Sequence, residues 1–253
     1  MRKLVTLSYS PWSERARWAL DHHGLAYQRV SHTPFLGELK LRRLLGKRRE
    51  GRATVPVLIA GDEVLTDSFD IALYADREGA GAKLIPKERE AEIRTFAERV
   101  DAAMQHGRVL LVSRLLASGP ARDETLPRWV PGVVRPLLRP VTHFGTAWFG
   151  RKYAIDLDSL ATHRAALRSA LDELRTALGG RDYVYGSFTW ADILLASIVQ
   201  GIAPVDDRYI RLGEASRKVW SHPDLAAEFA DLVTFRDELY ARHRSARPVA
   251  SAG

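Results

Sequence analysis

The sequence predicts a small α/β domain followed by a larger all-helical domain, and three observations support this prediction. Up to about residue 79, short apolar runs of strand length alternate with helix-like segments. After residue 86, apolar residues recur every three or four positions, which is the period of an α-helix. A run of Gly and Ala followed by Pro86 separates the two patterns, as a linker would. We therefore expect domains at 1–79 and 87–253, joined by a linker at 80–86.

The first domain is predicted to place two strands around a helix, followed by a second helix, a β-hairpin and a last helix. The first apolar run ends at the breaker Ser8-Tyr9-Ser10-Pro11, which predicts a strand that leads into a turn. Gly24 is a natural stop for the helix that follows, and the next strand comes at the spacing of a βαβ unit. The expected elements are, in order, a strand at Leu4–Leu7, a helix at Ser13–His23, a strand at Leu25–Val30, a basic helix at 38–49, a hairpin at Val55–Leu65 and a helix from Asp67 to about Arg77.

The second domain is predicted to be a helical bundle without an internal repeat. Thr189 and Asp192 have the spacing of a capping box and open a strongly apolar helix. Ser221-His222-Pro223-Asp224 opens the last helix in a similar way. The expected helices contain Ile93–Arg114, Leu160–Leu178, Ile193–Val199 and the residues from 221 to about His243.

Residues 118–157 lie between two of these helices and are too many for a plain connection. They are apolar enough to require burial, and their prolines exclude one long helix, so we expect short helical pieces. We expect these pieces to fold over the cleft between the domains and to form much of a substrate-binding site there. Contact with a second copy of the chain, or with a membrane surface, is the alternative. The prolines are Pro120, Pro127, Pro131, Pro136 and Pro140.

The composition limits the chemistry that this chain can perform. Its formal net charge of +7 suits an anionic ligand, an anionic membrane face or nucleic acid, but no nucleic-acid-binding motif is present, so we expect no nucleic acid. The sequence has no cysteine, which excludes a disulfide and a thiolate of the protein's own. Its eight histidines lack metal-binding spacing, and the first apolar run is too short for a signal peptide. We therefore expect a cytoplasmic protein without a metal.

Three short motifs are candidates for a binding site. Ser10 lies between a strand and a helix, beside helix N–H groups that favour an anion, and its hydroxyl can hydrogen-bond a bound sulfur. In Thr54-Val55-Pro56-Val57, a cis proline would present the backbone of Val55 to an extended peptide. Asp67-Ser68 can hold an ammonium and a carboxylate at a helix start. Simple helix capping is the alternative for the first and third motifs.

In this order and spacing, the motifs resemble the cytosolic glutathione S-transferases. YSPWSERARWAL is similar to the Ser-Pro-Phe pattern of the tau class and to the Cys-Pro-Phe-Ala-Glu-Arg pattern of the omega class, with Ser10 in place of the omega cysteine. TVPVL followed by TDS resembles the family's cis-proline strand and Glu/Asp-Ser pair, and GSFTWADILLA resembles its capping box. The resemblance covers 1–79 well and about 155–235 loosely, as in a divergent member of bacterial type.

This resemblance implies a thioredoxin-like first domain that binds glutathione as a cosubstrate. Ser10 would hydrogen-bond and stabilise the glutathione thiolate. The adjacent Tyr9 ranks below it, because side chains alternate along a strand and the strand ends there. Val55, ahead of cis Pro56, would pair its backbone with the cysteinyl unit.

The two ends of glutathione are also assigned by the resemblance. Asp67 and Ser68 would bind the γ-glutamyl end. The glycyl carboxylate would meet a basic residue in the segment before Pro56, which is more basic than the family norm. Arg52 and Lys40 are the two candidates, and the sequence does not choose between them.

The activity implied is a glutathione S-transferase that joins the thiolate to a small apolar electrophile, as in detoxification. A non-catalytic binding protein of the same fold and a glutathione-dependent isomerase or lyase are the alternatives. The resemblance also implies a homodimer, with the apolar stripe at Ile93, Phe96 and Val100 as a candidate contact. The residues expected around the electrophile are Trp12, Trp129, Phe144 and Trp148.

Overall fold

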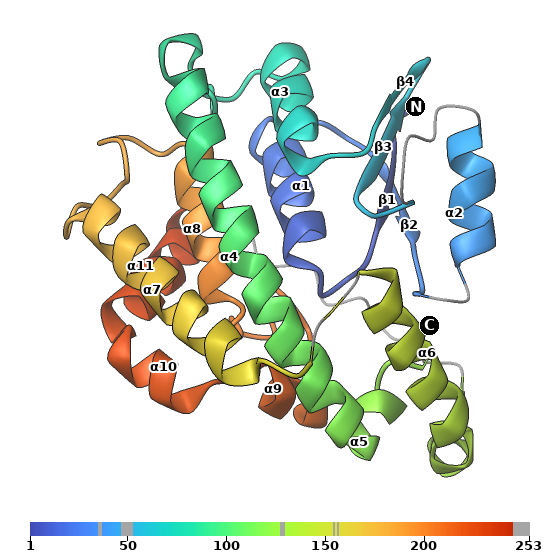
Figure 1. The fold of residues 1–253 in the computed structure, drawn as a ribbon. Coiled ribbons are helices and arrows are strands. Elements are labelled where there is room, and N and C mark those ends of the chain that lie inside the picture. Colours follow the sequence, from blue (N-terminus) through green and yellow to red (C-terminus); the bar gives the residue numbers. More distant parts are fainter. Residues whose placement is uncertain (35–36, 47–52, 127–129, 154, 156, 245–253) are drawn as a thin grey trace.

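The computed structural model describes residues 1–34, 37–46, 53–126, 130–153, 155 and 157–244. A four-stranded sheet lies near the N-terminus, and the remainder of the described chain is mostly helical (Figure 1). The predicted fold class, a thioredoxin-like α/β domain followed by a helical one, is therefore confirmed.

The N-terminal domain is a βαβ unit followed by a helix, a hairpin and a last helix. Its elements are, in chain order, β1 Lys3–Thr6, α1 Pro11–His22, β2 Gln28–Ser31, α2 Glu38–Leu45, β3 Val57–Ala60, β4 Glu63–Leu65 and α3 Ser68–Glu78. The strand order is β2-β1-β3-β4, with β1 and β2 parallel and the other two pairs antiparallel. In this register Leu4 lies opposite Arg29 on one side and Leu58 on the other.

Helices cover both faces of the sheet (Figure 1). α1 and α3 lie on the face toward the helical domain, where Leu4, Leu58 and Ile71 are buried in the main core. α2 lies on the opposite face, where Leu41 packs in a smaller core with Val57. The alternation of side chains along β1 and β3 supplies both cores, because consecutive residues of a strand point to opposite faces.

The ends of α1 differ from the prediction for local reasons. Ser10 is the N-cap and Pro11 the first helical residue, so the helix begins earlier than Ser13. At the other end Gly24 has φ +63° and the Leu25 amide donates to the Leu20 carbonyl at 2.9 Å, which closes the helix. Leu25 is therefore part of the helix stop, and β2 begins only at Gln28.

The helical part is centred on one long helix. Its elements are α4 Glu90–Ala117, α5 Gly119–Asp123, α6 Arg139–Lys152, α7 Leu160–Leu178, α8 Trp190–Val199, α9 Glu214–Trp220, α10 Pro223–Glu228 and α11 Ala230–His243, with 3-10 helices η2 Lys87–Arg89 and η3 Gly132–Leu138. α4 packs against α7 and α8 (Figure 1), and every residue of α8 is buried, which explains its apolar sequence. The stripe at Ile93, Phe96 and Val100 is buried within one chain, so it is core and not a surface for a second chain.

The predicted segment 118–157 forms short helices, as its prolines indicate, and α6 lies beside the sheet domain (Figure 1). The Lys152 ammonium at the end of α6 pairs with Glu38 of α2 at 2.8 Å. The single chain does not bury all the apolar residues of this segment, because Val133 is 86% and Leu137 78% exposed.

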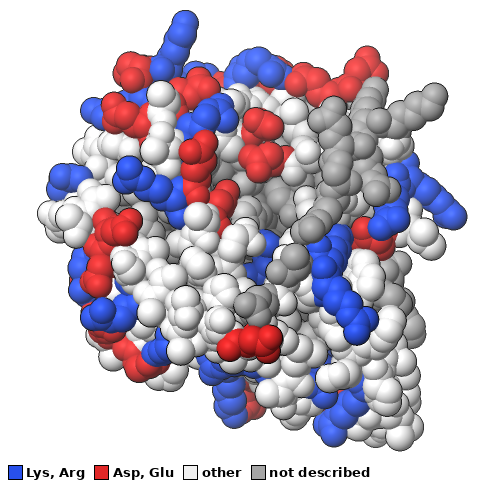
Figure 2. All heavy atoms as spheres, viewed as in Figure 1, with Lys and Arg blue, Asp and Glu red and all other residues white. Residues whose placement is uncertain are grey.

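Charged side chains of both signs intermingle over the face shown in Figure 2. Among the residues that the structure describes, no helix has the length and apolar character needed to cross a membrane.

Candidate functional site

A cavity of about 270 Å³ lies between the sheet domain and the helices, and all three predicted motifs line it. The N-terminal domain contributes Ser10, Pro11 and Trp12 at the start of α1, Val55 and Pro56 before β3, and Asp67 and Ser68 at the start of α3. These residues are up to 58 positions apart in sequence, because 68 − 10 = 58, yet they share one wall. The opposite wall comes mainly from α4, the end of α6 and the end of α8.

Ser10 caps a helix in a geometry that also leaves its predicted ligand role open. Its Oγ accepts a long hydrogen bond from the Ser13 amide at 3.5 Å, so it caps α1. An acceptor uses a lone pair and not the hydroxyl proton, so that proton can be donated to a ligand in the cavity. The start of α1 adds the partial positive charge of a helix N-terminus at the same place.

Tyr9 also lines the cavity. As a donor to the thiolate it was ranked below Ser10, on the argument that side chains alternate along the strand. β1 ends at Thr6, and the chain then turns, so alternation no longer decides where Tyr9 points. Its ring contacts Trp220 edge to face, with 6.3 Å between the ring centroids. Burial raises the pKa of the Tyr9 phenol to about 12, so the group stays protonated and is a second donor in this wall.

The other two motifs also line the cavity. The Val55–Pro56 peptide bond is cis, and both residues line the cavity just before β3. Asp67 is the N-cap of α3, where its Oδ1 accepts from the Phe69 amide at 2.7 Å. Asp67 is exposed and Ser68 is buried, and both line the cavity, so capping and ligand contact are compatible here.

An ion pair with a buried arginine fixes the wall beside Trp12. Arg15, only 1% exposed, pairs with Asp101 of α4 at 2.6 Å and donates to the Ser197 hydroxyl of α8 at 2.7 Å. The same Asp101 oxygen accepts from the Trp12 indole N–H at 3.0 Å. The indole orientation is therefore set by residues of the helical domain, which the local sequence around Trp12 does not reveal.

Comparisons with known proteins agree with this geometry. The family model described as "Glutathione S-transferase, N-terminal domain" matches residues 4–83. The chain is therefore similar to glutathione S-transferases in sequence over residues 4–83 and in fold over almost its whole length. The likeness to the tau and omega classes remains a prediction from the motifs. A comparison with proteins of curated function finds no match.

Solved structures of proteins named glutathione transferases share the fold over almost the whole chain. A glutathione S-transferase from Methylobacillus flagellatus with glutathione bound is 18% identical, with a TM-score of 0.60 and 96% of each chain covered. One from Methylobacterium radiotolerans, in complex with glutathione sulfonate, is 17% identical, with a TM-score of 0.59, covering 100% of this chain and 99% of that one. A glutathione transferase from Phanerochaete chrysosporium is 17% identical, with a TM-score of 0.66, covering 97% and 99%.

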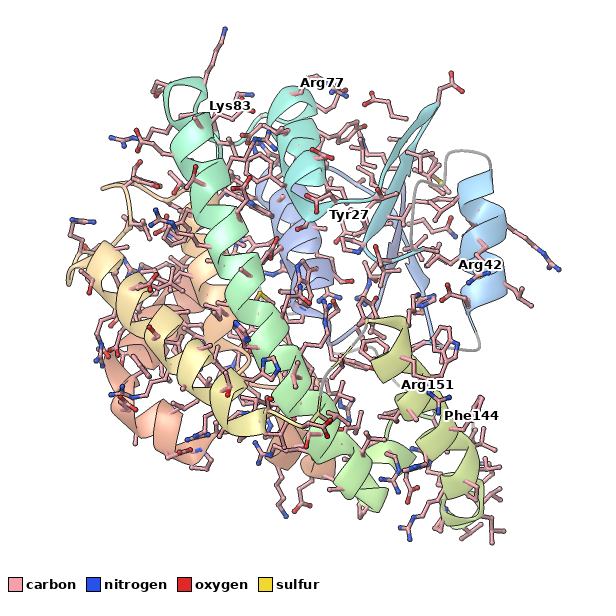
Figure 3. All side chains as sticks on the ribbon, viewed as in Figure 1. Tyr27, Arg42, Arg77, Lys83, Phe144 and Arg151 are labelled. Carbon is pink, nitrogen blue, oxygen red and sulfur yellow. The ribbon has the colours of Figure 1, made fainter. Side chains whose placement is uncertain are left out.

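Not all residues predicted for the superfamily's site reach this cavity. Arg52 and Trp129 lie outside the described residues. Lys40 is exposed on α2 and is not part of the cavity wall. Phe144 is 52% exposed on the outer side of α6 (Figure 3) and does not line the cavity either. Trp148 lines a separate small cavity of about 20 Å³ beside the first one.

The aromatic residues of α6 that do line the main cavity are Phe149 and the C-cap Tyr153. They follow Phe144 at spacings of five and nine positions, so they lie on a different face of the helix. Two residues of segment 118–157 therefore line the cavity, but they are not the ones named from the sequence, which does not show which face of the helix turns inward. Among the described residues, no group of three or more His, Asp or Glu side chains could hold a metal.

Proposed function

We propose that the chain is a glutathione S-transferase that binds glutathione in the main cavity and joins its thiolate to a small electrophile. The observation that supports this proposal is the meeting of the Ser10, Val55–Pro56 and Asp67–Ser68 motifs on one wall of a single cavity. Two structural neighbours of the same fold were crystallised with glutathione or glutathione sulfonate.

In the proposed complex, Asp67 pairs with the γ-glutamyl ammonium, while Ser68 and the start of α3 bind the γ-glutamyl carboxylate. The backbone of Val55 pairs with the cysteinyl unit, as an added strand would. These contacts place the sulfur beside Ser10 and the start of α1. The glycyl carboxylate would meet Arg52 or Lys40, although Lys40 lies outside the cavity wall of the structure.

The chemistry requires an ionised thiol. A free cysteine thiol has a pKa of about 8.5, so most of it is protonated at neutral pH. A hydrogen bond from Ser10 and the positive end of α1 both favour the anion, and each unit by which they lower the pKa corresponds to about 1.4 kcal/mol. The thiolate sulfur then forms a bond to an electrophilic carbon. In a substitution the leaving group departs with its bonding electrons, and in an addition the product carbanion takes a proton from water.

The test combines a binding measurement and a product analysis on the whole chain. Calorimetric titration with glutathione should show saturable binding, and incubation with glutathione and chlorodinitrobenzene should release chloride and form the thioether. Absence of glutathione binding would indicate the non-catalytic alternative. Binding without a conjugate, but with glutathione-dependent isomerisation or cleavage of another substrate, would indicate the isomerase or lyase.

A further inference from the structure

Arg108 is the cation of the main cavity that no described partner neutralises. It lies on α4, on the wall opposite the proposed glutathione contacts. Among the residues that the structure describes, its Nη1 donates a hydrogen bond to the Gln105 Oε1 at 2.7 Å, and it takes part in no ion pair. The nearby Asp101 is already paired with Arg15 at 2.6 Å.

The planar guanidinium of Arg108 is held between two aromatic rings. Its central carbon lies 4.5 Å from the centroid of the Trp12 ring and 4.4 Å from that of Tyr153. Both rings line the same cavity, so they fix the guanidinium at its wall and leave flat apolar surface around it. This arrangement limits the conformations of a long side chain before any ligand arrives, which reduces the entropy lost on binding.

The electrostatics of this wall favour an anion. Burial lowers the pKa of Arg108, with Tyr153 and Asp101 acting in the opposite direction, but an arginine remains protonated at neutral pH. Arg15 and Asp101 cancel each other, so Arg108 leaves one net positive charge on this wall. A partly buried charge without a counter-ion is costly, and an anionic ligand would offset that cost.

We propose that Arg108 binds a carboxylate or sulfonate group on the electrophile, whose flat apolar body packs against the neighbouring rings of Trp12, Phe149 and Tyr153. This inference rests on the proposed function, because the bound anion is an electrophile only if glutathione occupies the opposite wall of the cavity. It narrows the acceptor class from small apolar molecules to aromatic molecules that carry an anionic group. Arg108 is then the residue that determines this specificity.

The first test uses two fluorescent probes that differ only by the anionic group, so it needs no enzymatic activity. Anilinonaphthalene sulfonate carries a sulfonate, and N-phenyl-naphthylamine has the same rings without it. Arg108→Gln should weaken binding of the sulfonate probe about tenfold and change binding of the neutral probe less than about twofold. Arg108→Lys, which keeps the charge, should recover much of the preference for the sulfonate.

A matched control is Arg89→Gln. Arg89 also stacks on a ring, with its guanidinium carbon 5.2 Å from the Tyr185 centroid, but neither residue lines the cavity. This variant should leave both probe affinities unchanged. Equal losses for both probes in Arg108→Gln would mean that Arg108 only packs the cavity wall, and no loss for either would mean that the probes do not meet it. Both results would overturn the proposal.

The second test measures turnover with a matched pair of acceptors, a chlorodinitrobenzoate and chlorodinitrobenzene. Arg108→Gln should lower kcat/KM for the benzoate about tenfold relative to the neutral acceptor, with glutathione affinity unchanged. A loss of glutathione affinity with an unchanged acceptor preference would assign Arg108 to the glycyl carboxylate and overturn the proposal. If the wild-type chain binds no glutathione, the proposed function fails, while the probe measurement still decides the role of Arg108.

Discussion

At the scale of single residues, two side chains of the cavity wall also cap helices. Ser10 caps α1 and Asp67 caps α3, yet both line the cavity. Each cap uses one acceptor lone pair of the side chain. Ser10 keeps its hydroxyl proton, which a thiolate could accept, and Asp67 keeps further lone pairs, to which an ammonium could donate. The capping alternatives considered from the sequence therefore do not exclude the binding roles.

His222 gives a prediction for the dependence of stability on pH. It is buried, and burial together with Arg114 and Arg164 lowers its pKa from 6.5 to about 4. As the pH falls from 6.5 toward 4, the unfolded chain takes up a proton that the folded chain refuses, so the free energy of unfolding falls. His222→Asn should remove this loss, because Asn can also cap α10 and does not titrate.

The measurement is urea unfolding of both proteins at about pH 7 and about pH 5. Between these values the wild type should lose roughly 2 kcal/mol more than His222→Asn. Substituting the exposed His143 by Asn should leave the wild-type dependence in place. Equal losses in the wild type and His222→Asn would contradict the assignment.

At the scale of elements, the start of α8 gives a stability prediction. The buried Asp192 carboxylate accepts from the amides of Val184 at 2.8 Å and Thr189 at 2.7 Å, and from the Thr189 hydroxyl at 3.0 Å. Asp192→Ala should lower the free energy of unfolding by about 3 kcal/mol, because two buried N–H groups lose their acceptor. Urea unfolding measures this loss.

Glu214 offers a matched control at the start of α9. It is an exposed first-turn carboxylate that pairs with Lys218 at 2.7 Å. Glu214→Ala should lower the free energy of unfolding far less than Asp192→Ala does, because an exposed pair gains little. A similar loss in both variants would show that burial of the Asp192 hydrogen bonds is not what stabilises α8.

The sequence predicted the elements and their order better than their ends. Periodicity identifies helices and strands, but Leu25 illustrates why the ends are harder to predict, since its apolar side chain suits a strand while its amide closes α1. Similarly, one last helix was expected from residue 221 to about His243, and the structure divides it into α10 and α11 at Phe229. The local sequence pattern does not show where tertiary packing ends a helix or divides it in two.

The same limit applies to the site. The wall from the N-terminal domain was predicted because its residues lie in short motifs with local mechanisms. The opposite wall was missed at Arg108, Asp101 and Trp220, because each is one unremarkable residue of a helix until the helices pack. The pairing of Arg15 with Asp101 joins residues 86 positions apart, and the sequence around neither residue predicts it.

At the scale of the whole molecule, one continuous core joins the two domains, from Leu4 in β1 to Tyr240 in α11. Arg244, after α11, strengthens this connection by pairing with Glu14 at 2.8 Å and Asp21 at 2.6 Å, both on α1. We therefore expect the two domains to unfold together in urea, as one cooperative unit.

The homodimer remains a proposal from the family resemblance, because the apolar stripe first suggested as its contact is internal. The exposed apolar residues of η3 and α6 are a different surface for such a contact, with Val133, Leu137 and Phe144 among them. Light scattering at micromolar concentration should give a mass about twice the 28.3 kDa of one chain. A single species near the mass of one chain would contradict the proposal.

We propose that the cavity binds glutathione and that Ser10 lowers the pKa of its thiol. The most direct test is the ultraviolet thiolate absorbance of the glutathione complex, followed against pH in the wild type and in Ser10→Ala. We predict that the wild-type complex titrates at least one pH unit below free glutathione, whose thiol has a pKa of about 8.5. Ser10→Ala should titrate closer to the free value and turn over about tenfold more slowly, with glutathione affinity largely kept by the contacts at both ends. The same titration and the same rate in both proteins would contradict the claim and leave Ser10 as a helix cap alone.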